Sequence, residues 1–491
     1  MTQQPDPIVT IAPGRVRGFW RDGSAAFLGI PFAQPPTGEL RFAAPVPPDP
    51  WDGVRDALAY GATAKRDKPG EKTLIPEPAV PGESTLNVNV FTPEPGRTDA
   101  ALPVLVYIHG GGYTEGSPAS PWYDGASFNR DGVVTVSLSY RLGFDGFGHI
   151  PGAPSNRGVR DWLAGLEWVR ENIQAFGGDP GRVTIAGQSA GGGAVLTLLG
   201  MPAAQGLFHG VWALSPALAD VPAELARTLS AKVANLAGVT PTREGFASVA
   251  ESTLLQYQEA AAKPDSKDPL AAIHALLIDG LIWGPMIDGD LIVRPTVDSL
   301  GAGIGAGIPL VLGTTDDEFT MATEGVKNKV RLVPSALALR ALRVGGSTRT
   351  AYLAANSAQR RKGTAAVLGR YVSDVVFRSG VVRVADARAG EDTWVYRFSW
   401  PSPVIGWACH CLDVPFWFDC LGAEGVPELA GEHPPRALAD AVHGSAAAFV
   451  RDGAPGWPSW SAASGITRVF GGDPSRPDVM ADGYASVRAL V

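Results

Sequence analysis

Cysteine is scarce in this sequence. The chain has 491 residues but 3 cysteines, and all of them lie between residues 409 and 420. An odd number of cysteines in one short stretch does not build a disulfide framework, which excludes a small disulfide-stapled fold. Apolar runs long enough to span a bilayer are also missing. Residues 1–18 show no basic segment followed by an apolar core, so we expect no signal peptide and a location in the reducing cytoplasm.

An excess of positive charge is missing as well. The chain carries 41 Lys and Arg against 49 Asp and Glu, a net charge of −8. This balance argues against a nucleic-acid partner and against binding to an anionic membrane. The expected partner, a small-molecule substrate, is inferred from the motifs that follow, and no pattern in the sequence indicates an oligomeric state.

The sequence does contain enough apolar residues for a large core, at 45% against 18% charged. Short β-branched runs end at Gly or a turn, and helical segments follow several of them. These runs cover residues 86–91, 103–110, 133–140 and 182–187. Strands that alternate with helices predict an α/β fold with a mostly parallel sheet. Residues 8–30 alternate apolar and polar and predict a small antiparallel sheet, while helix-rich insertions are expected around 220–275 and 330–390.

A strand-to-helix turn carries the strongest chemical signal. The segment RVTIAGQSAGGGAVLTLL contains Gly187-Gln188-Ser189-Ala190-Gly191, a G-x-S-x-G pattern between a β-branched strand and a helix. In a nucleophile elbow of this kind the serine occupies a sharp turn, and its neighbours two residues away must be small. The positive end of the following helix favours the negative charge that develops in acyl transfer. The alternative is a glycine-rich turn with an idle serine.

A second glycine cluster lies about 80 residues upstream. His109-Gly110-Gly111-Gly112 follows directly after an apolar strand. This is the HGGG form of an oxyanion hole, in which backbone N–H groups approach the reacting oxygen without side chains in the way. We expect the N–H groups of Gly111, Gly112 and Ala190 to bind that oxygen.

An acid and a base are expected after the serine in the chain order of this hydrolase type. The strand-like segment 308–315 ends in three carboxylates, and carboxylates at the end of a parallel strand lie at the edge where ligands bind. They are Asp316, Asp317 and Glu318. Three histidines follow them. Of these, His433 lies in a polar turn and His443 on a helix face, whereas His410 follows a strand and precedes the apolar segment LDVPFWF.

These motifs together resemble the type-B carboxylesterases, the branch of the α/β-hydrolase fold that also contains the cholinesterases. The resemblance covers nearly the whole chain, with blocks such as FLGIPFAQPPTGELRF, NRGVRDWLAGLEWVRENIQAFGGDPGRVTIAGQSAGG, VLGTTDDEF and HCLDVPFWF. It implies a single α/β-hydrolase domain over residues 1–491 that cleaves small or aryl carboxylic esters without a cofactor. It also implies a catalytic triad of Ser189, Glu318 and His410, with Ser215 as a supporting serine.

The resemblance further implies two structural ion pairs, Arg141 with Asp161 and Arg41 with Glu83. Among the departures from the family pattern, two lie next to the proposed triad. Gln188 replaces the usual glutamate before the nucleophile, which weakens any case for cationic choline esters, and Phe319 replaces the usual glycine after the acid. Candidate pocket residues are Gln188, Ser215 and the aromatic residues next to the motifs, for which plain core packing is the alternative. The aromatic candidates are Tyr113, Trp122, Phe319 and Trp407.

Other interpretations remain at this stage. Cys409-His410-Cys411 could suggest a metal site, but neighbouring residues of an extended chain point in opposite directions and structural zinc needs four spaced ligands. The glycine-rich segment 301–307 lacks the GxGxxG spacing of a nucleotide loop. The same triad could hydrolyse aryl carbamates or other xenobiotic esters. A non-catalytic binding protein would lack the triad, and a lipase would need an apolar lid where residues 64–84 are polar and expected to form an exposed loop.

Overall fold

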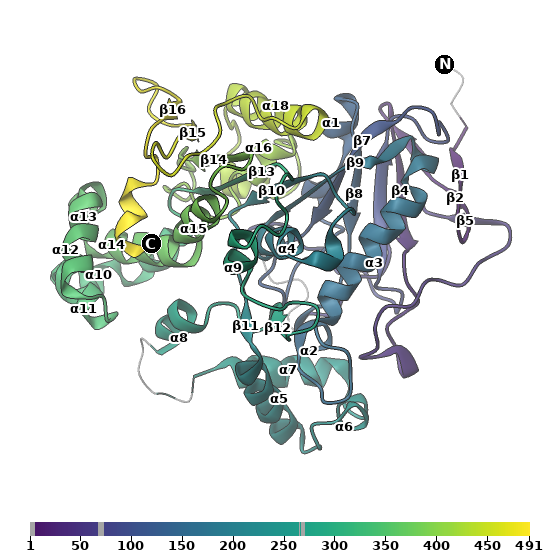
Figure 1. Cartoon of the computed structure of the whole chain (residues 1–491), viewed down its shortest axis with the longest axis horizontal. Coiled ribbons are helices and arrows are strands. Elements are labelled where there is room, and N and C mark those ends of the chain that lie inside the picture. The colour runs from purple at the N-terminus through teal and green to yellow at the C-terminus, as the bar shows by residue number, and fades with distance from the viewer. Residues whose placement is uncertain (1–4, 67–72, 265, 267–270) are drawn as a thin grey trace.

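The computed structural model describes residues 5–66, 73–264, 266 and 271–491. Within these residues the centre is an 11-stranded sheet of order β16-β15-β14-β13-β10-β9-β7-β8-β6-β4-β3 (Figure 1). Its strands are β3 Phe19–Arg21, β4 Ser24–Pro31, β6 Asn87–Thr92, β7 Leu102–Ile108, β8 Val134–Leu138, β9 Gly178–Gln188, β10 Gly210–Leu214, β13 Leu310–Thr315, β14 Thr393–Phe398, β15 Thr467–Phe470 and β16 Val479–Met480. The strands expected from β-branched runs are β6, β7, β8 and β9, so those predictions are confirmed.

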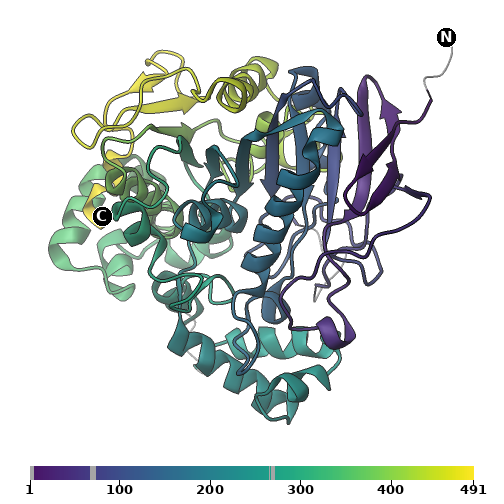
Figure 2. The same ribbon diagram turned by 45° about the vertical axis from the view of Figure 1, so that its right-hand side comes forward.

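The seven neighbouring strands β15-β14-β13-β10-β9-β7-β8 pair in parallel, and antiparallel strands flank this group at both ends of the sheet. The N-terminal strands and the yellow C-terminal strands thus lie at opposite ends of the sheet (Figure 2). A small separate sheet is built from β1 Ile8–Ile11, β2 Gly14–Arg17 and β5 Val54–Asp56. The expected antiparallel pair is β1 with β2, whereas β3 and β4 extend the main sheet.

Helices cover both faces of the main sheet, because successive side chains of a strand point to opposite sides. Val104, Val106 and Ile108 of β7 pack with α3 Arg157–Asn172 and α4 Ala190–Leu199. Leu105 and Tyr107 of the same strand pack with α16 Val414–Trp417 and α18 Arg436–Asp452 on the other face. This arrangement agrees with the predicted α/β fold.

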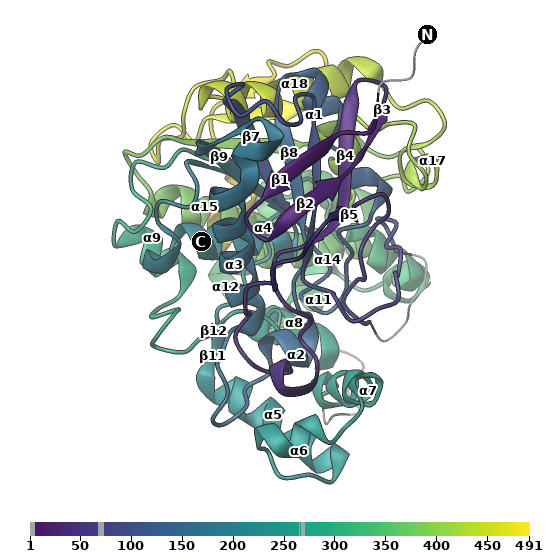
Figure 3. The ribbon, with the colours of Figure 1, turned by 90° about the vertical axis from the view of Figure 1, so that its right-hand side faces the viewer.

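The two expected helical insertions are present. The first lies below the sheet in Figures 1 and 3 and contains α5 Ala223–Ala237, α6 Arg243–Ala247 and α7 Glu251–Ala262, followed by α8 Ala271–Asp279. The second contains α10 Lys327–Val330, α11 Ser335–Ala341, α12 Gly346–Ala355, α13 Ser357–Lys362, α14 Thr364–Ser373, the π-helix η6 Asp374–Arg378 and α15 Ser379–Ala387. Among the described residues, no helix combines the length and the apolar character needed to cross a membrane.

One of the two expected ion pairs is present. Arg141 Nη2 lies 2.7 Å from Asp161 Oδ1, and both side chains are buried. The other prediction is wrong, because Arg41 Nε lies 3.1 Å from Asp145 Oδ2 instead of pairing with Glu83. Asp145 lies in the short helix α2 Gly143–Phe147, which presents its carboxylate to Arg41, whereas Glu83 is exposed.

The described part of segment 64–84 is a loop, as its polar sequence predicts, but it is not exposed throughout. Residues 67–72 of the segment lie outside the described residues. In the remainder Arg66 and Ile75 are buried, and Glu77 is mostly buried beside Arg66. The prediction of exposure is wrong at Arg66 and Glu77 because two opposite charges that pair can be buried together, which composition alone does not indicate.

Candidate active site

Ser189 occupies the sharp turn between β9 and α4. Its backbone has φ 59° and ψ −121°, a conformation that costs a non-glycine residue free energy and needs support from its surroundings. That support comes from hydrogen bonds in which Ser189 N–H donates to Leu214 O at 2.9 Å and Ser189 O accepts from Ala217 N at 3.0 Å. A Cβ on Gly187 would lie 2.4 Å from Gly191 O, and a Cβ on Gly191 would lie 2.1 Å from Ile108 O, so both positions need glycine. The predicted elbow geometry is therefore present.

His410 and Glu318 form a buried pair beside this turn. His410 Nδ1 lies 2.5 Å from Glu318 Oε2, and the backbone N–H of His410 donates to Glu318 O at 2.9 Å. Glu318 Oε1 accepts from Thr315 N–H at 2.9 Å, so both oxygens of the carboxylate are bonded. On the opposite edge of the ring, Nε2 of His410 lies 3.1 Å from Nε2 of Gln188. The imidazole thus lies between the acid and the residue that precedes Ser189.

Charge at His410 is set by its neighbours. Burial opposes the imidazolium, but Cys411 and Glu318 outweigh burial and raise the pKa of His410 well above its usual value. Because burial also raises the pKa of the Cys411 thiol, that thiol is neutral near pH 7 and Glu318 supplies the charge that acts on the ring. In the neutral imidazole the proton lies on Nδ1, which faces Glu318, and Nε2 is the nitrogen that can accept a proton; the raised pKa makes it a stronger base.

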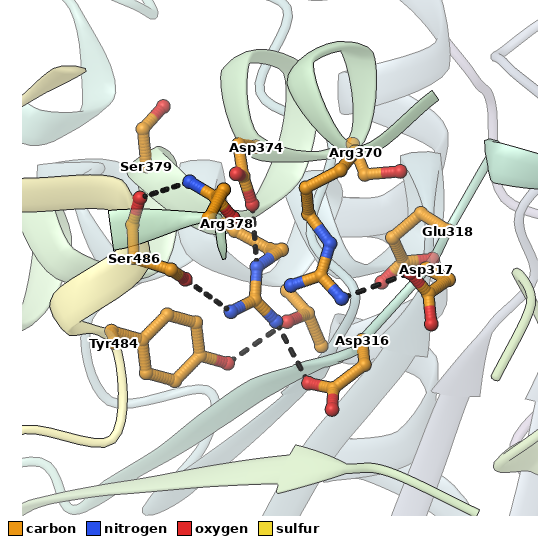
Figure 4. A network of polar contacts seen from close by, with 12 residues as sticks. Asp316, Asp317, Glu318, Arg370, Asp374, Arg378, Ser379, Tyr484 and Ser486 are labelled. Atoms are coloured by element: carbon orange, nitrogen blue, oxygen red, sulfur yellow. Dashed lines mark hydrogen bonds and ion pairs between the residues drawn. The ribbon is translucent and has the colours of Figure 1, made fainter. Parts of the chain in front are cut away.

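Glu318 is one of three consecutive carboxylates, and the other two form ion pairs with arginines (Figure 4). Arg370 Nη2 lies 2.9 Å from Asp317 Oδ1. Asp316 pairs with two guanidinium groups, Arg397 at 2.7 Å and Arg378 at 3.0 Å. Burial would raise the pKa of Asp316, but these arginines outweigh it and lower the pKa far below its usual range. Of the three carboxylates, Glu318 is the one that reaches a histidine.

Two phenylalanine rings cover His410. The ring of Phe319 stacks on the imidazole with centroids 5.0 Å apart, and Phe377 lies at 4.9 Å. Phe319 is half-buried, and its N–H donates to Ser373 Oγ at 3.1 Å. Phe377 belongs to the π-helix η6, a distortion that often occurs at functional sites. No local sequence pattern indicates Phe377, because its position depends on how the second insertion packs.

The HGGG loop lies between β7 and the elbow. Gly111 and Gly112 have positive φ values of 105° and 60°, which explains glycine at both positions. A Cβ on Gly110 would lie 2.6 Å from Gln188 O, so the loop contacts the elbow backbone directly. His109 stacks on Tyr140 at 4.5 Å, and burial lowers the pKa of His109 to about 4. His109 is therefore neutral near pH 7.

The remaining candidates divide between site and core. Gln188 contacts His410 as described above, and Ser215 is buried with an Oγ that has no hydrogen-bond partner among the described residues. Tyr113 is fully buried against Phe147 and Trp162, which fits the core alternative. Trp122 is likewise buried, and its Nε1–H donates to Glu424 O. Trp407 is mostly buried, with Nε1–H donating to Glu324 at 3.2 Å.

The other histidines and the thiols lie in different environments. His433 is exposed, and His443 bonds to Trp417 O and Asp131, each at 2.8 Å. All three cysteines fall in the described stretch 271–491 and are free thiols. Within the described residues, no group of three or more His, Cys, Asp or Glu side chains is placed to share a metal ion.

Comparisons with known proteins find matches along nearly the whole chain. The sequence model of the carboxylesterase family matches residues 5–467. The chain is 32% identical to para-nitrobenzyl esterase of Bacillus subtilis, over 94% of this chain and 93% of that protein. It is also 32% identical to phenmedipham hydrolase of Pseudarthrobacter oxydans, over 99% of both chains. The crystal structure of Geobacillus stearothermophilus carboxylesterase EST55 superimposes with a TM-score of 0.82 at 32% identity, covering 98% of this chain and 99% of that one.

Proposed function

The chain belongs to the carboxylesterase family and is a carboxylesterase of the α/β-hydrolase fold. On this premise we propose that it cleaves small or aryl carboxylic esters with Ser189 as nucleophile, His410 as base and Glu318 as acid. The observation that carries the proposal is the buried contact of 2.5 Å between His410 Nδ1 and Glu318 Oε2, next to a strained serine at a strand-to-helix turn. A serine nucleophile needs a histidine base in the correct tautomer, and a buried carboxylate on the other ring nitrogen fixes that tautomer.

The reaction follows from these positions. Nε2 of His410 takes the proton of Ser189 while Oγ attacks the ester carbonyl. The carbonyl oxygen becomes an oxyanion, for which we propose the N–H groups of Gly111, Gly112 and Ala190 as donors; losing one such donor typically costs about 3–4 kcal/mol of barrier. The tetrahedral intermediate then expels the alcohol, which leaves with the proton of His410.

In the second half of the cycle the acyl-enzyme is hydrolysed, with water as the nucleophile and Ser189 as the leaving group. Water attacks the acyl carbon, His410 takes its proton, and the carboxylic acid leaves as the proton returns to Ser189. Glu318 stabilises the imidazolium in both halves of the cycle. We place Gln188, Ser215 and Phe319 around the substrate, because each lies next to the triad or the elbow. The three free thiols support our expectation of a cytoplasmic location.

The test is a series of p-nitrophenyl esters, from acetate to palmitate, with the wild type and Ser189→Ala. We expect turnover of the short esters, and a fall in kcat of about 10⁴-fold or more in the variant at an unchanged melting temperature. A fluorophosphonate probe followed by mass spectrometry checks the nucleophile independently, because it labels an activated serine. Labelling at a serine other than Ser189 would contradict the assignment.

The full-length likeness to the protein named phenmedipham hydrolase favours a second candidate. In this alternative the natural substrate is an aryl carbamate or another xenobiotic ester, cleaved by the same triad. Matched pairs that differ only in an ester or carbamate carbonyl separate the two candidates. A kcat/KM that is higher for the carbamate of a pair would favour the second.

A further inference from the structure

A buried ion pair touches the far end of the HGGG loop. Glu77 Oε2 accepts from the backbone N–H of Gly116 at 2.9 Å and from Arg66 Nη1 at 2.6 Å. Arg66 Nη2 also donates to the backbone oxygen of Glu77 at 2.7 Å. Next to this contact, Ser117 Oγ donates to Pro78 O at 2.7 Å. Glu77 and Pro78 thus form hydrogen bonds with Gly116 and Ser117 at the end of the loop.

We propose that Arg66 and Glu77 are positioning residues for the oxyanion hole: Glu77 fixes the loop at Gly116, and Arg66 neutralises the carboxylate that does so. This inference rests on the proposed function and deepens it. It assigns a role in catalysis to a segment whose sequence predicts an exposed loop.

The geometry of the loop explains how Gly116 acts on the glycines at its other end. A Cβ on Gly111 would lie 2.6 Å from Gly116 N, and a Cβ on Gly116 would lie 2.2 Å from both Gly110 O and His109 Nδ1. Gly111 O in turn accepts from the N–H groups of Thr114 at 3.0 Å and Glu115 at 2.8 Å. Gly116 therefore packs directly against the backbone of the residues that precede and form the proposed oxyanion hole. A shift at Gly116 moves them.

Charge gives the pair a second effect. A carboxylate near the site would oppose the oxyanion of the tetrahedral intermediate, and this repulsion is strong where water is excluded. The exposed fractions of the Arg66 and Glu77 side chains are 6% and 12%. Burial raises the pKa of Glu77, while the Gly116 N–H and Arg66 lower it and Glu115 raises it further. The net pKa of Glu77 is raised because burial outweighs the other effects; Arg66 opposes that rise and offsets the charge that the carboxylate brings.

The experiment compares two competitive inhibitors. An aryl trifluoromethyl ketone reacts with the Ser189 hydroxyl: the Oγ–carbon bond forms, the proton passes to His410, and the carbonyl oxygen becomes an oxyanion. The corresponding methyl ketone fills the same pocket without forming an oxyanion. The ratio of the two inhibition constants therefore reports on formation of the Ser189 adduct and its oxyanion rather than on filling of the pocket. A loss of general stability leaves it unchanged, and Arg66 and Glu77 contact neither Ser189 nor His410 in the hydrogen bonds described above.

The variants are Arg66→Gln, Glu77→Gln and the double variant. Arg66→Gln removes both contacts that hold Glu77 in place and the positive charge that offsets it, so we expect its trifluoromethyl ketone constant to rise by about 10- to 100-fold, with the methyl ketone within about twofold. Glu77→Gln keeps an oxygen for Gly116 and adds no negative charge, so its loss is smaller. The double variant removes both charges and recovers most of the affinity. Asp386→Asn is the control, because it breaks an ion pair with Arg488 that involves neither the HGGG loop nor the segment that contains Arg66 and Glu77.

Each outcome decides something. If Arg66→Gln lowers the melting temperature but leaves the inhibitor ratio at the wild-type value, the pair is an ordinary structural ion pair and the inference is wrong. If Arg66→Gln does not fold, the double variant Arg66→Gln/Glu77→Ala, which removes the acceptor of the Gly116 N–H, is expected to raise the ratio by about tenfold, and a wild-type ratio in it contradicts the inference instead. If Ser189→Ala binds the trifluoromethyl ketone as tightly as the wild type does, the proposed function is wrong. This result is distinct from the failure of the inference about Arg66 and Glu77.

Discussion

The side-chain nitrogen of Gln188 lies 3.1 Å from Nε2 of His410, the nitrogen that the proposed mechanism assigns to the Ser189 proton. Because Nδ1 of the ring faces Glu318 and carries a proton, Nε2 of the neutral imidazole is an acceptor, and the Gln188 amide donates to it. Gln188 therefore favours the neutral base, whereas Glu318 favours the charged one. Cys411 and Asp413 also lie near the ring, but each is neutral over part of the working pH range, since burial raises both pKa values.

Replacing Gln188 by glutamate reverses that preference. A carboxylate at Nε2 stabilises the imidazolium, so we expect the acid limb of the kcat/KM profile of Gln188→Glu to move up by about one pH unit. The measurement is the pH dependence of p-nitrophenyl acetate hydrolysis between pH 5 and 9. Gln188→Met removes the amide without adding charge and should fall between the two. An acid limb at the same pH in all three enzymes would show that Gln188 does not act on the base.

Glu318 and Asp317 provide a matched pair of carboxylate-to-amide changes. Glu318→Gln removes the charge that fixes the tautomer of His410, so we expect kcat to fall by about 10³- to 10⁴-fold. Asp317→Asn leaves Arg370 without its partner, which lowers stability but changes kcat by less than about tenfold. Steady-state kinetics and thermal melts of both variants check this. A harmless Glu318→Gln beside a damaging Asp317→Asn would mean that the wrong carboxylate has been assigned.

Phe319 is expected to limit the size of the substrate. Its ring stacks on His410 and is half-buried, so removing it opens space beside the base without emptying the core. We expect Phe319→Ala to raise kcat/KM for bulky esters relative to acetate by about tenfold. Phe319→Leu keeps most of the volume and should stay near the wild type. An unchanged ratio in Phe319→Ala would place the substrate on the other side of His410.

The elbow could be predicted because a local pattern encodes it, whereas the choice of Glu318 and His410 rests on the resemblance to the type-B carboxylesterases. Glycine is required at positions 187 and 191 because a Cβ there would collide with neighbouring backbone atoms. The spacing of these glycines around a serine can be recognised in the sequence without a structure. The strand before Asp316 likewise predicts carboxylates at the sheet edge. Chain order then leaves few histidines after them.

The rest of the site depends on packing that no local pattern records. Phe377 reaches His410 because a π-helix turns it inward, and Arg66 is buried because Glu77 lies beside it. Arg41 pairs with Asp145 because α2 brings that carboxylate close. In none of these cases are the two partners neighbours on one regular helix or strand, so periodicity carries no signal.

Asp413 gives a prediction about stability rather than activity. It is buried, accepts from the Tyr396 hydroxyl at 3.0 Å, and has an Oδ1 without a hydrogen-bond partner among the described residues. Burial, and then the charge of Glu318, raise its pKa from the usual 3.8 to about 7. Between these two values the unfolded chain has lost the proton while the folded protein keeps it. Folding stability therefore falls as pH rises through this range, by up to about 1.4 kcal/mol per pH unit for this group, and levels off above pH 7.

Asp413→Asn mimics the protonated acid and keeps an oxygen for Tyr396. The variant should lack this contribution to the pH dependence, so its stability relative to the wild type is expected to increase between pH 5 and pH 8. Urea unfolding at several pH values measures the difference directly. Asp440→Asn, at an exposed position of α18, is the control and should show no such trend. A difference between Asp413→Asn and the wild type that stays constant from pH 5 to pH 8 would mean that Asp413 is already ionised in the folded protein at pH 5, with its charge stabilised by groups other than Tyr396.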